Sequence, residues 1–213
     1  MNQKTAMKLF GLLGLLMLLS CGYADRHRNS SLCEQALVDS LEVRVQDSLF
    51  SNVHYSRSQL LEALTQTQDS LVYYRLLALY GKTFFVSSDF DSILYYNRRV
   101  KEFSRNASQS SESLQSPRWN DVLSDVYNIE GNVWMQLNRP DSAIIDYKKA
   151  YGYRLEGKKL HLLPDICINI ADAYLHRSDL AHTASYYRRA LFLCDSLNLS
   201  EHMKFPVYYG LGQ

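Results

Sequence analysis

The side chains that could catalyse a reaction or bind a metal do not stand at the spacings that such chemistry requires. The histidines lie at positions 27, 54, 161, 176, 182 and 202, and they form no HExxH motif and join no CxxC motif. No glycine-rich loop is followed by the lysine and helix of a phosphate site, and no serine stands in a nucleophile elbow. Carboxylate pairs such as Asp89 and Asp91 stand at predicted helix starts, where negative charge favours the helix dipole. The sequence therefore predicts no catalytic residue, no metal site, no cofactor and no enzyme activity.

The N-terminal segment has the pattern of a secretory signal. Lys4 and Lys8 precede an apolar run over residues 9–19. This run is too short to cross a bilayer, which needs about 20 helical residues, but it has the length of a signal-peptide core. We therefore expect residues 1–20 to be a processed signal peptide.

The signal ends in Leu18-Leu19-Ser20-Cys21, which resembles the lipobox of bacterial lipoproteins. The resemblance implies that Cys21 is lipid-modified and becomes the first residue of the mature chain, whose acyl chains would hold it on a membrane surface. Gly22 in the next position favours, by the same resemblance, the outer membrane of a bacterial cell envelope with the protein facing the periplasm. The alternative is an ordinary signal peptide followed by a chance cysteine. Residues 21–31 are polar and aperiodic and predict a tether.

The charge balance argues against a nucleic-acid partner. Without the first twenty residues the chain carries 21 basic and 22 acidic residues, because Lys4 and Lys8 are the only charges removed from 23 and 22. A nucleic-acid surface needs a basic stripe instead. Cys33, Cys167 and Cys194 would remain beside a lipidated Cys21, and three is odd, so we expect no disulfide framework. Cys167 and Cys194 either bond to each other or fill small buried sites.

Asp-Ser followed by an aliphatic residue occurs six times, at 39–41, 47–49, 69–71, 91–93, 141–143 and 195–197. The triplet resembles the O-glycosylation acceptor of some bacterial envelopes, and Ser92 and Ser142 would be the exposed candidates. The alternative is that Asp and Ser open helices.

The body of the chain repeats one pattern of small, aromatic and basic residues. Segments 90–100, 140–150 and 180–190 each predict an amphipathic helix with a small or apolar residue in fourth place, aromatics near seventh and eighth, and two bases. A second helix precedes each of them, with a small residue and an aromatic three positions later. A small residue lets two antiparallel helices approach, and the aromatic fills the space beside it.

This two-helix unit resembles the tetratricopeptide repeat (TPR). The resemblance covers units of about 74–107, 124–157 and 164–197, with the start of a further unit from 205 (YYGLGQ at 208–213), which suggests a truncated chain. It implies an all-α superhelix of antiparallel helix pairs over residues 67–213, preceded by an N-terminal helical cap over 32–66 with helices near 32–49 and 58–64. The implied repeat-packing residues are Gly81, Phe84, Gly131, Trp134, Ala143, Tyr147, Ala150, Ala171, Tyr174, Tyr187 and Ala190.

Several positions depart from the TPR pattern. Glu130 takes an apolar place, with Ile129 as the residue that could turn inward instead, and Asn97 takes an aromatic place beside Tyr96. The steps from Gly81 to Gly131 and on to Ala171 are longer than the usual period of about 34 residues. We ascribe the extra length to longer helices and to a serine-rich run at 105–117, which we expect to be an exposed loop.

The TPR resemblance also implies a concave groove, lined by the first helix of each pair, that binds a peptide of a partner protein. The positions that would face it include Lys82, Phe85, Asn128, Asn132, Met135, Asp172 and Leu175. An ordinary hydrated face is the alternative. The full Lys/Asn/Arg set of a chaperone carboxylate clamp is not present.

We therefore expect an envelope-anchored TPR scaffold that mediates protein–protein interaction, anchored in a membrane by its lipid. The alternative is the extracytoplasmic sensor part of a membrane-bound transcriptional regulator, in which a TPR array is followed by a transmembrane helix and a helix-turn-helix domain.

Overall fold

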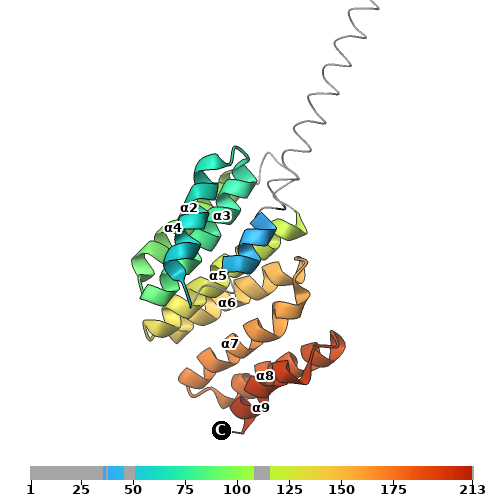
Figure 1. Cartoon of the computed structure of the whole chain (residues 1–213). Helices are drawn as coiled ribbons and strands as arrows, with labels where there is room; N and C mark the ends of the chain where they lie inside the picture. The colour runs from blue at the N-terminus through green and yellow to red at the C-terminus, as the bar shows by residue number, and fades with distance from the viewer. Residues whose placement is uncertain (1–35, 37, 46–50, 108–115, 213) are drawn as a thin grey trace, which may run out of the picture.

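The structure, a computed structural model, describes residues 36, 38–45, 51–107 and 116–212. A helix at residues 38–45 comes first, and no β-strand occurs in these ranges, which confirms the predicted all-α fold (Figure 1). The helices that follow are α2 (Val53–Gln66), α3 (Ser70–Lys82), α4 (Phe90–Ala107), α5 (Pro117–Gln136), α6 (Pro140–Leu155), α7 (Leu163–His176), α8 (Leu180–Ser196) and α9 (Phe205–Leu211). Short 3₁₀ segments, η1 (Thr83–Ser87), η3 (Leu160–Leu162) and η4 (Glu201–Lys204), adjoin α3, α7 and α9.

Cys21, the predicted signal peptide and the predicted tether lie outside the described residues. None of the helices that the structure describes is both long and apolar enough to cross a membrane.

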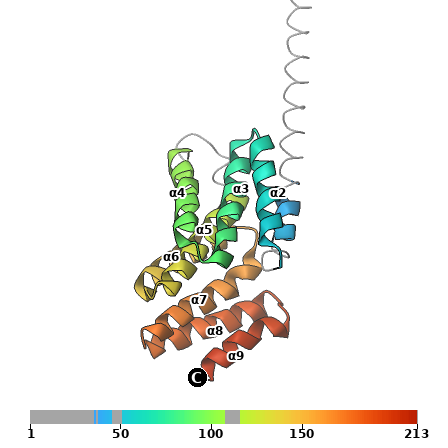
Figure 2. The ribbon, with the colours of Figure 1, turned by 60° about the vertical axis from the view of Figure 1, so that its left-hand side comes forward.

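The helices from α3 onward are arranged as pairs that stack one after another (Figures 1 and 2). α3 packs on α4, α5 on α6, and α7 on α8, while α4 contacts α5 and α6 contacts α7 to join successive pairs. The first helices also contact one another in the order α3, α5, α7 and α9. They therefore line one common face of the stack.

The turn between the two helices of each pair has the same backbone geometry in all three described pairs. One residue adopts the left-handed conformation with φ of 52–58°, and the N–H of the next residue donates to the carbonyl five residues back in a Schellman motif. The left-handed residues are Ser88, Asn138 and Ser178, and the accepting carbonyls belong to Phe84, Trp134 and Tyr174. The aromatic residue predicted near the end of each first helix therefore also supplies the carbonyl that accepts the hydrogen bond of the turn.

Glycines set the distance between the paired helices. A Cβ atom added at Gly81 would lie 2.9 Å from the Cβ of Tyr96, and one added at Gly131 would collide with the ring of Tyr147. Ala171 is fully buried in a cluster with Tyr187. Gly210 of α9 lies so close to the Tyr187 ring that a Cβ there would also collide with it.

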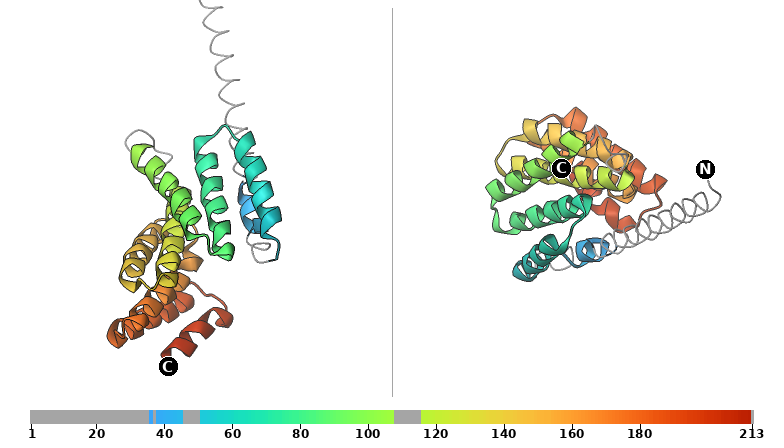
Figure 3. Two further views of the ribbon diagram at one scale, coloured as in Figure 1. Left: turned by 90° about the vertical axis from the view of Figure 1, so that its left-hand side faces the viewer. Right: turned by 90° about the horizontal axis from the view of Figure 1, so that it is seen from above.

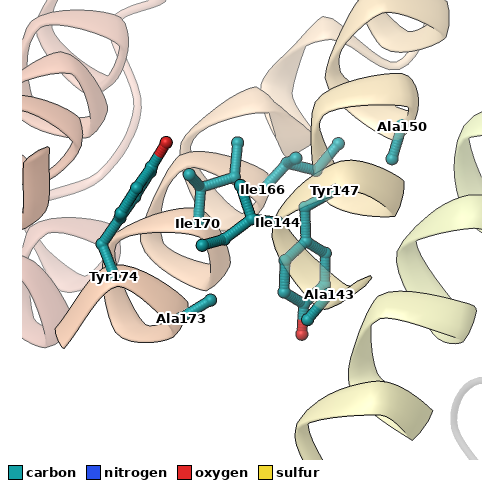
Figure 4. Close-up of a cluster of buried hydrophobic side chains, with 8 residues drawn as sticks. All are labelled: Ala143, Ile144, Tyr147, Ala150, Ile166, Ile170, Ala173 and Tyr174. Carbon is teal, nitrogen blue, oxygen red and sulfur yellow. The ribbon is translucent and has the colours of Figure 1, made fainter. Parts of the chain in front are cut away.

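The core between α6 and α7 shows how neighbouring pairs join (Figure 4). Small residues of α6 leave space into which aliphatic side chains of α7 pack, and Tyr147 and Tyr174 lie on either side of them. The buried members are Ala143, Ile144, Tyr147, Ala150, Ile166, Ile170, Ala173 and Tyr174. Of the repeat-packing residues named from the sequence, Phe84 and Trp134 are half-buried and the others are buried.

The helix at 38–45 and α2 pack onto the N-terminal end of the stack (Figure 3). α2 begins at Val53, five residues earlier than expected, because Asn52 caps it by accepting a hydrogen bond from the N–H of Tyr55 at 3.1 Å.

Two of the first helices also begin earlier than the predicted repeat units. α3 begins at Ser70, where the Asp69 carboxylate accepts the N–H of Leu71 at 2.8 Å, and α5 begins at Pro117 behind the capping hydroxyl of Ser116. The resulting 20 residues of α5 account for part of the long repeat step.

The serine-rich run at 105–117, expected to be a loop, is helical or caps a helix where the structure describes it. Its first three residues, up to Ala107, belong to α4, and Ser116 caps α5. The remainder lies outside the described residues.

Glu130 and Asn97, the two polar residues at places where the TPR pattern has apolar or aromatic ones, are both buried. Glu130 itself is buried, at 3% exposed, and Lys101 of α4 donates to it at 2.6 Å, so Ile129 does not replace it. Burial raises the pKa of the Glu130 carboxyl despite this partner. Asn97 is also buried and donates to the carbonyl of Val126 at 3.2 Å. Two polar side chains thus connect α4 to α5 where apolar contacts were expected.

Two glycine-to-alanine substitutions should distinguish the effect of helix packing on the free energy of unfolding from the effect of helix propensity. Gly131→Ala places a methyl group against the buried Tyr147 ring and should reduce the free energy of unfolding by about 1–3 kcal/mol through overpacking. Gly152→Ala, in the same pair, meets nothing within 4 Å and should raise it by up to about 1 kcal/mol. Urea denaturation of both variants measures the difference, and equal shifts of the same sign would contradict the packing of Tyr147 on Gly131.

Candidate functional site

A cavity of about 630 Å³ lies on the face that the first helices line. Its walls come from helix 38–45, α3, α5, the α6–α7 connection and the start of α7. Its apolar lining is contributed mainly by α3 and α5 and by the start of α7, namely Ala78, Leu79, Val122, Val126, Ile129 and Ile166. The cavity therefore combines contributions from all three successive helix pairs with one from the N-terminal helix.

Arg75 of α3 is the central charged side chain of this cavity. It is only 7% exposed, and its Nη2 donates to Asp39 Oδ1 at 2.7 Å and lies 3.9 Å from Glu42 Oε2. Its Nη1 is buried and has no hydrogen-bond partner. A buried guanidinium with an unused donor is costly, because the lost hydration of that N–H is not replaced. Arg75 therefore keeps one donor nitrogen without an acceptor beneath the cavity lining.

Cations from three separate elements meet the carboxylates of helix 38–45. Besides Arg75 of α3, Arg118 of α5 lies 3.2 Å from Asp39, and Lys159 of the α6–α7 connection pairs with Glu42. These ion pairs join parts of the chain that are up to 117 residues apart. They fix helix 38–45 as one wall of the cavity.

A buried cluster around Arg154 positions the α6–α7 connection. Arg154 is 1% exposed, its Nη1 donates to Asp121 at 2.7 Å, and its Nη2 donates to Asp125. The Asp121 carboxylate also accepts the backbone N–H groups of Lys158 and Lys159 at 3.0 and 3.2 Å. The cluster thus holds both lysines at the cavity wall.

Gly157 is required by the same cluster. A Cβ at this position would collide with the Asp121 carboxylate. A glycine here lets the carboxylate approach the backbone N–H groups of the two following residues.

Sequence reasoning did not find this cluster. Its one local signal is the four-residue spacing of Asp121 and Asp125, which places both carboxylates on one side of a helix. Arg154 is 33 residues from Asp121 and 29 from Asp125, and no periodic pattern connects them.

The predicted groove residues divide between two cavities. Lys82 and Asn128 line the large one. Met135, Asp172 and Leu175 line a smaller cavity of about 260 Å³, which also touches Tyr147, Asn169 and His176. The structure therefore does not bring all seven candidates together.

Asn132 and Phe85 line neither of these two cavities. The amide oxygen of Asn132 accepts from the Tyr147 hydroxyl at 2.8 Å. In the next pair, Asp172 accepts from the Tyr187 hydroxyl, at the same sequence separation of 15 residues. Phe85 lies in η1 with its ring 6.4 Å from that of Phe90. Asn132 and Asp172, both predicted to face a ligand, therefore accept hydrogen bonds from buried tyrosines of the repeat instead.

Burial keeps the hydroxyl groups of Tyr147 and Tyr187 protonated, so that each can donate a hydrogen bond. Removal from water raises the pKa of the Tyr147 and Tyr187 hydroxyls well above the usual value, so both remain protonated at neutral pH. In each bond the tyrosine hydroxyl donates to an oxygen atom, of the Asn132 amide or of the Asp172 carboxylate.

The arrangement favours noncovalent recognition. The large cavity offers an apolar lining beside paired charges, and two of its lining residues, Arg75 and Arg154, each keep one buried guanidinium nitrogen without a hydrogen-bond partner. Among the described residues, no three His, Cys, Asp or Glu side chains gather as a metal site would require. Cys167 and Cys194 are both buried and unbonded, and burial raises the pKa of both thiols, that of Cys167 to about 12.

Comparison with protein-family models and with curated proteins gives no match. Among solved structures, the chain is similar to BtubC (BKLC) from P. vanneervenii, with a TM-score of 0.61 and 19% sequence identity, over 89% of this chain and 77% of that one. At this identity the likeness concerns the fold alone. The chain is accordingly an all-α protein with a helical-repeat-like fold of stacked helix pairs.

The buried Arg154 cluster should contribute much more stability than an exposed ion pair. Asp121→Ala removes one carboxylate from a buried guanidinium and should reduce the free energy of unfolding by about 3–5 kcal/mol. The control Asp141→Ala breaks the exposed pair with Arg177 and should cost about 1 kcal/mol or less. Urea denaturation compares the two, and similar losses would show that the cluster does not hold the connection in place.

Proposed function

We propose that this protein is a TPR-like scaffold that binds a peptide segment of a partner protein on the face lined by α3, α5 and α7. The observation that carries the proposal is the 630 Å³ cavity, where an apolar lining adjoins the cationic side chains of Arg75, Arg118 and Lys159. A peptide offers both an apolar side chain and backbone carbonyls, so it can fill the cavity and accept hydrogen bonds from its cationic lining.

The extent of the cavity along the stack supports a peptide over a compact ligand. It reaches from Lys82 of α3 through Asn128 of α5 to Asp165 of α7. A ligand that contacts all three helices must therefore span several elements, as an extended or helical segment does. The resemblance of the helix pairs to TPR units is a second support, because the first helices of that family line a peptide-binding face.

We also propose that a lipid on Cys21 anchors this scaffold in a bacterial envelope, at the outer membrane and facing the periplasm. The support is the sequence Leu18-Leu19-Ser20-Cys21 at the end of the apolar signal. The acyl chains would hold the helical stack near the membrane while its binding face stays in water.

Peptide binding should depend on the apolar lining of the cavity. A random 12-residue peptide library displayed on phage, selected against the mature chain, provides a defined peptide whose affinity is then measured by fluorescence anisotropy. Ile129→Glu places a charge inside the cavity and should weaken binding at least tenfold. The control Ile145→Glu changes an isoleucine that is 56% exposed on α6 and should leave binding unchanged. Selected peptides that bind both variants equally, or a selection that yields no binder, would contradict the proposal.

Lipidation should depend on one cysteine. Labelled palmitate should enter the protein expressed in a bacterial envelope, and Cys21→Ala should abolish the label. Cys33→Ala removes the next cysteine in the chain and should leave the label in place. Label that persists in Cys21→Ala, or its absence from the wild-type protein, would exclude the anchor.

A further inference from the structure

The helix at residues 38–45 packs on the stack with its apolar side. Val38, Leu41 and Val45 are only 1–3% exposed and form a cluster with Leu60, Ala63, Val72 and Leu76 of α2 and α3. Their spacing of three and four residues is that of one helix face. The apolar face of this helix thus covers part of α3, which is one of the first helices.

Carboxylates on the same helix face the cations of the cavity. Asp39 and Glu42 are three residues apart, so they lie on one side of the helix. Asp39 pairs with Arg75 at 2.7 Å and with Arg118 at 3.2 Å, and Glu42 pairs with Lys159. One turn of an acidic helix therefore pairs with cations of α3, α5 and the α6–α7 connection.

This pairing resembles the way a separate helical peptide would bind a groove. The helix contributes an apolar stripe and two acids, and the face contributes an apolar surface and three cations. Val43 is 62% exposed and lines the cavity, so an apolar side chain of the helix already borders the space that a ligand would enter. The charges of the two surfaces are complementary, which favours this class of partner over others.

A competing helix could replace some of the contacts that hold helix 38–45 on the stack. Asp39 and Arg118 are 47% and 36% exposed in their side chains, so salt and water weaken their attraction. Another acidic helix could make the same ion pairs and also fill the cavity beside Val43.

We propose that helix 38–45 is an intramolecular ligand of this face, and that the partner is an acidic amphipathic helix which displaces it and places a carboxylate on Arg75. This rests on the proposed function for the identity of the binding face. Partner binding is then regulated by the chain itself, because helix 38–45 must leave before the partner can pair with Arg75, Arg118 and Lys159.

The first test measures how firmly the acids hold the helix, and it needs no partner. In the mature chain, Asp39→Asn combined with Glu42→Gln removes both charges and keeps the apolar stripe. Hydrogen–deuterium exchange followed by mass spectrometry should show at least tenfold faster exchange over residues 38–45 in this variant. The matched control combines Glu62→Gln and Glu102→Gln, which removes two exposed acids of α2 and α4 and should leave that exchange unchanged. Equal exchange in the two variants overturns the proposal.

The second test asks whether the face accepts an acidic helix from outside. A fluorescein-labelled peptide with the sequence of residues 36–45 should bind the Asp39→Asn/Glu42→Gln protein at least tenfold more tightly than the wild type, as measured by anisotropy. A peptide in which Asn and Gln replace the two acids should bind neither protein. Equal affinity for both proteins, or equal binding of both peptides, overturns the proposal.

The two tests separate this inference from the proposed function. If the display-selected peptide binds in an Ile129-dependent manner while the 36–45 peptide does not bind, the face binds peptides but the acidic-helix class is wrong. If no peptide binds while exchange over 38–45 responds to the acids, the proposed function fails and the helix is only a structural part of the stack, so the present proposal fails with it.

Discussion

The close approach of two helices at a residue without a large side chain is the constraint on which the rest of this structure depends. At Gly131 the backbone of α5 lies against the Tyr147 ring, and at Gly81 the backbone of α3 lies against Tyr96. Helices held this close bury their aromatic side chains, and the Tyr147 hydroxyl must then find a partner, which Asn132 provides. Each pair so formed still has an apolar side, and the next pair covers it. The common face of the first helices follows from this stacking.

Buried charges connect the layers that apolar packing builds. Arg154 with Asp121 joins α6 to α5, and Lys101 with Glu130 joins α4 to α5. A charge that leaves water needs a partner, so each buried cation specifies which carboxylate lies beside it and fixes the register of two helices. Arg75 and Arg154 meet this rule only in part, because one nitrogen of each remains buried without an acceptor.

A helical-repeat-like fold creates a common face along its first helices, but the fold alone does not determine what that face binds. The likeness to BtubC (BKLC) at 19% identity concerns the path of the chain, and side chains on the binding face differ freely at that distance. The cavity residues support the proposed peptide partner, and Asp39 and Glu42, which already pair with the cations there, support its proposed acidic character. Under this proposal, the protein's own N-terminal helix partly covers the face that the partner would bind.

The sequence by itself determined the all-α class and the helix pairs, because these depend on periodicity and on short-range patterns such as the small residue Gly131 followed three positions later by the aromatic Trp134. Only the tertiary structure decided that Glu130 is buried against Lys101, that Arg154 holds the α6–α7 connection, and that helix 38–45 lines the large cavity. The partners in these contacts are 29 or more residues apart. Their meeting depends on how the pairs stack, which no periodic pattern in the chain encodes.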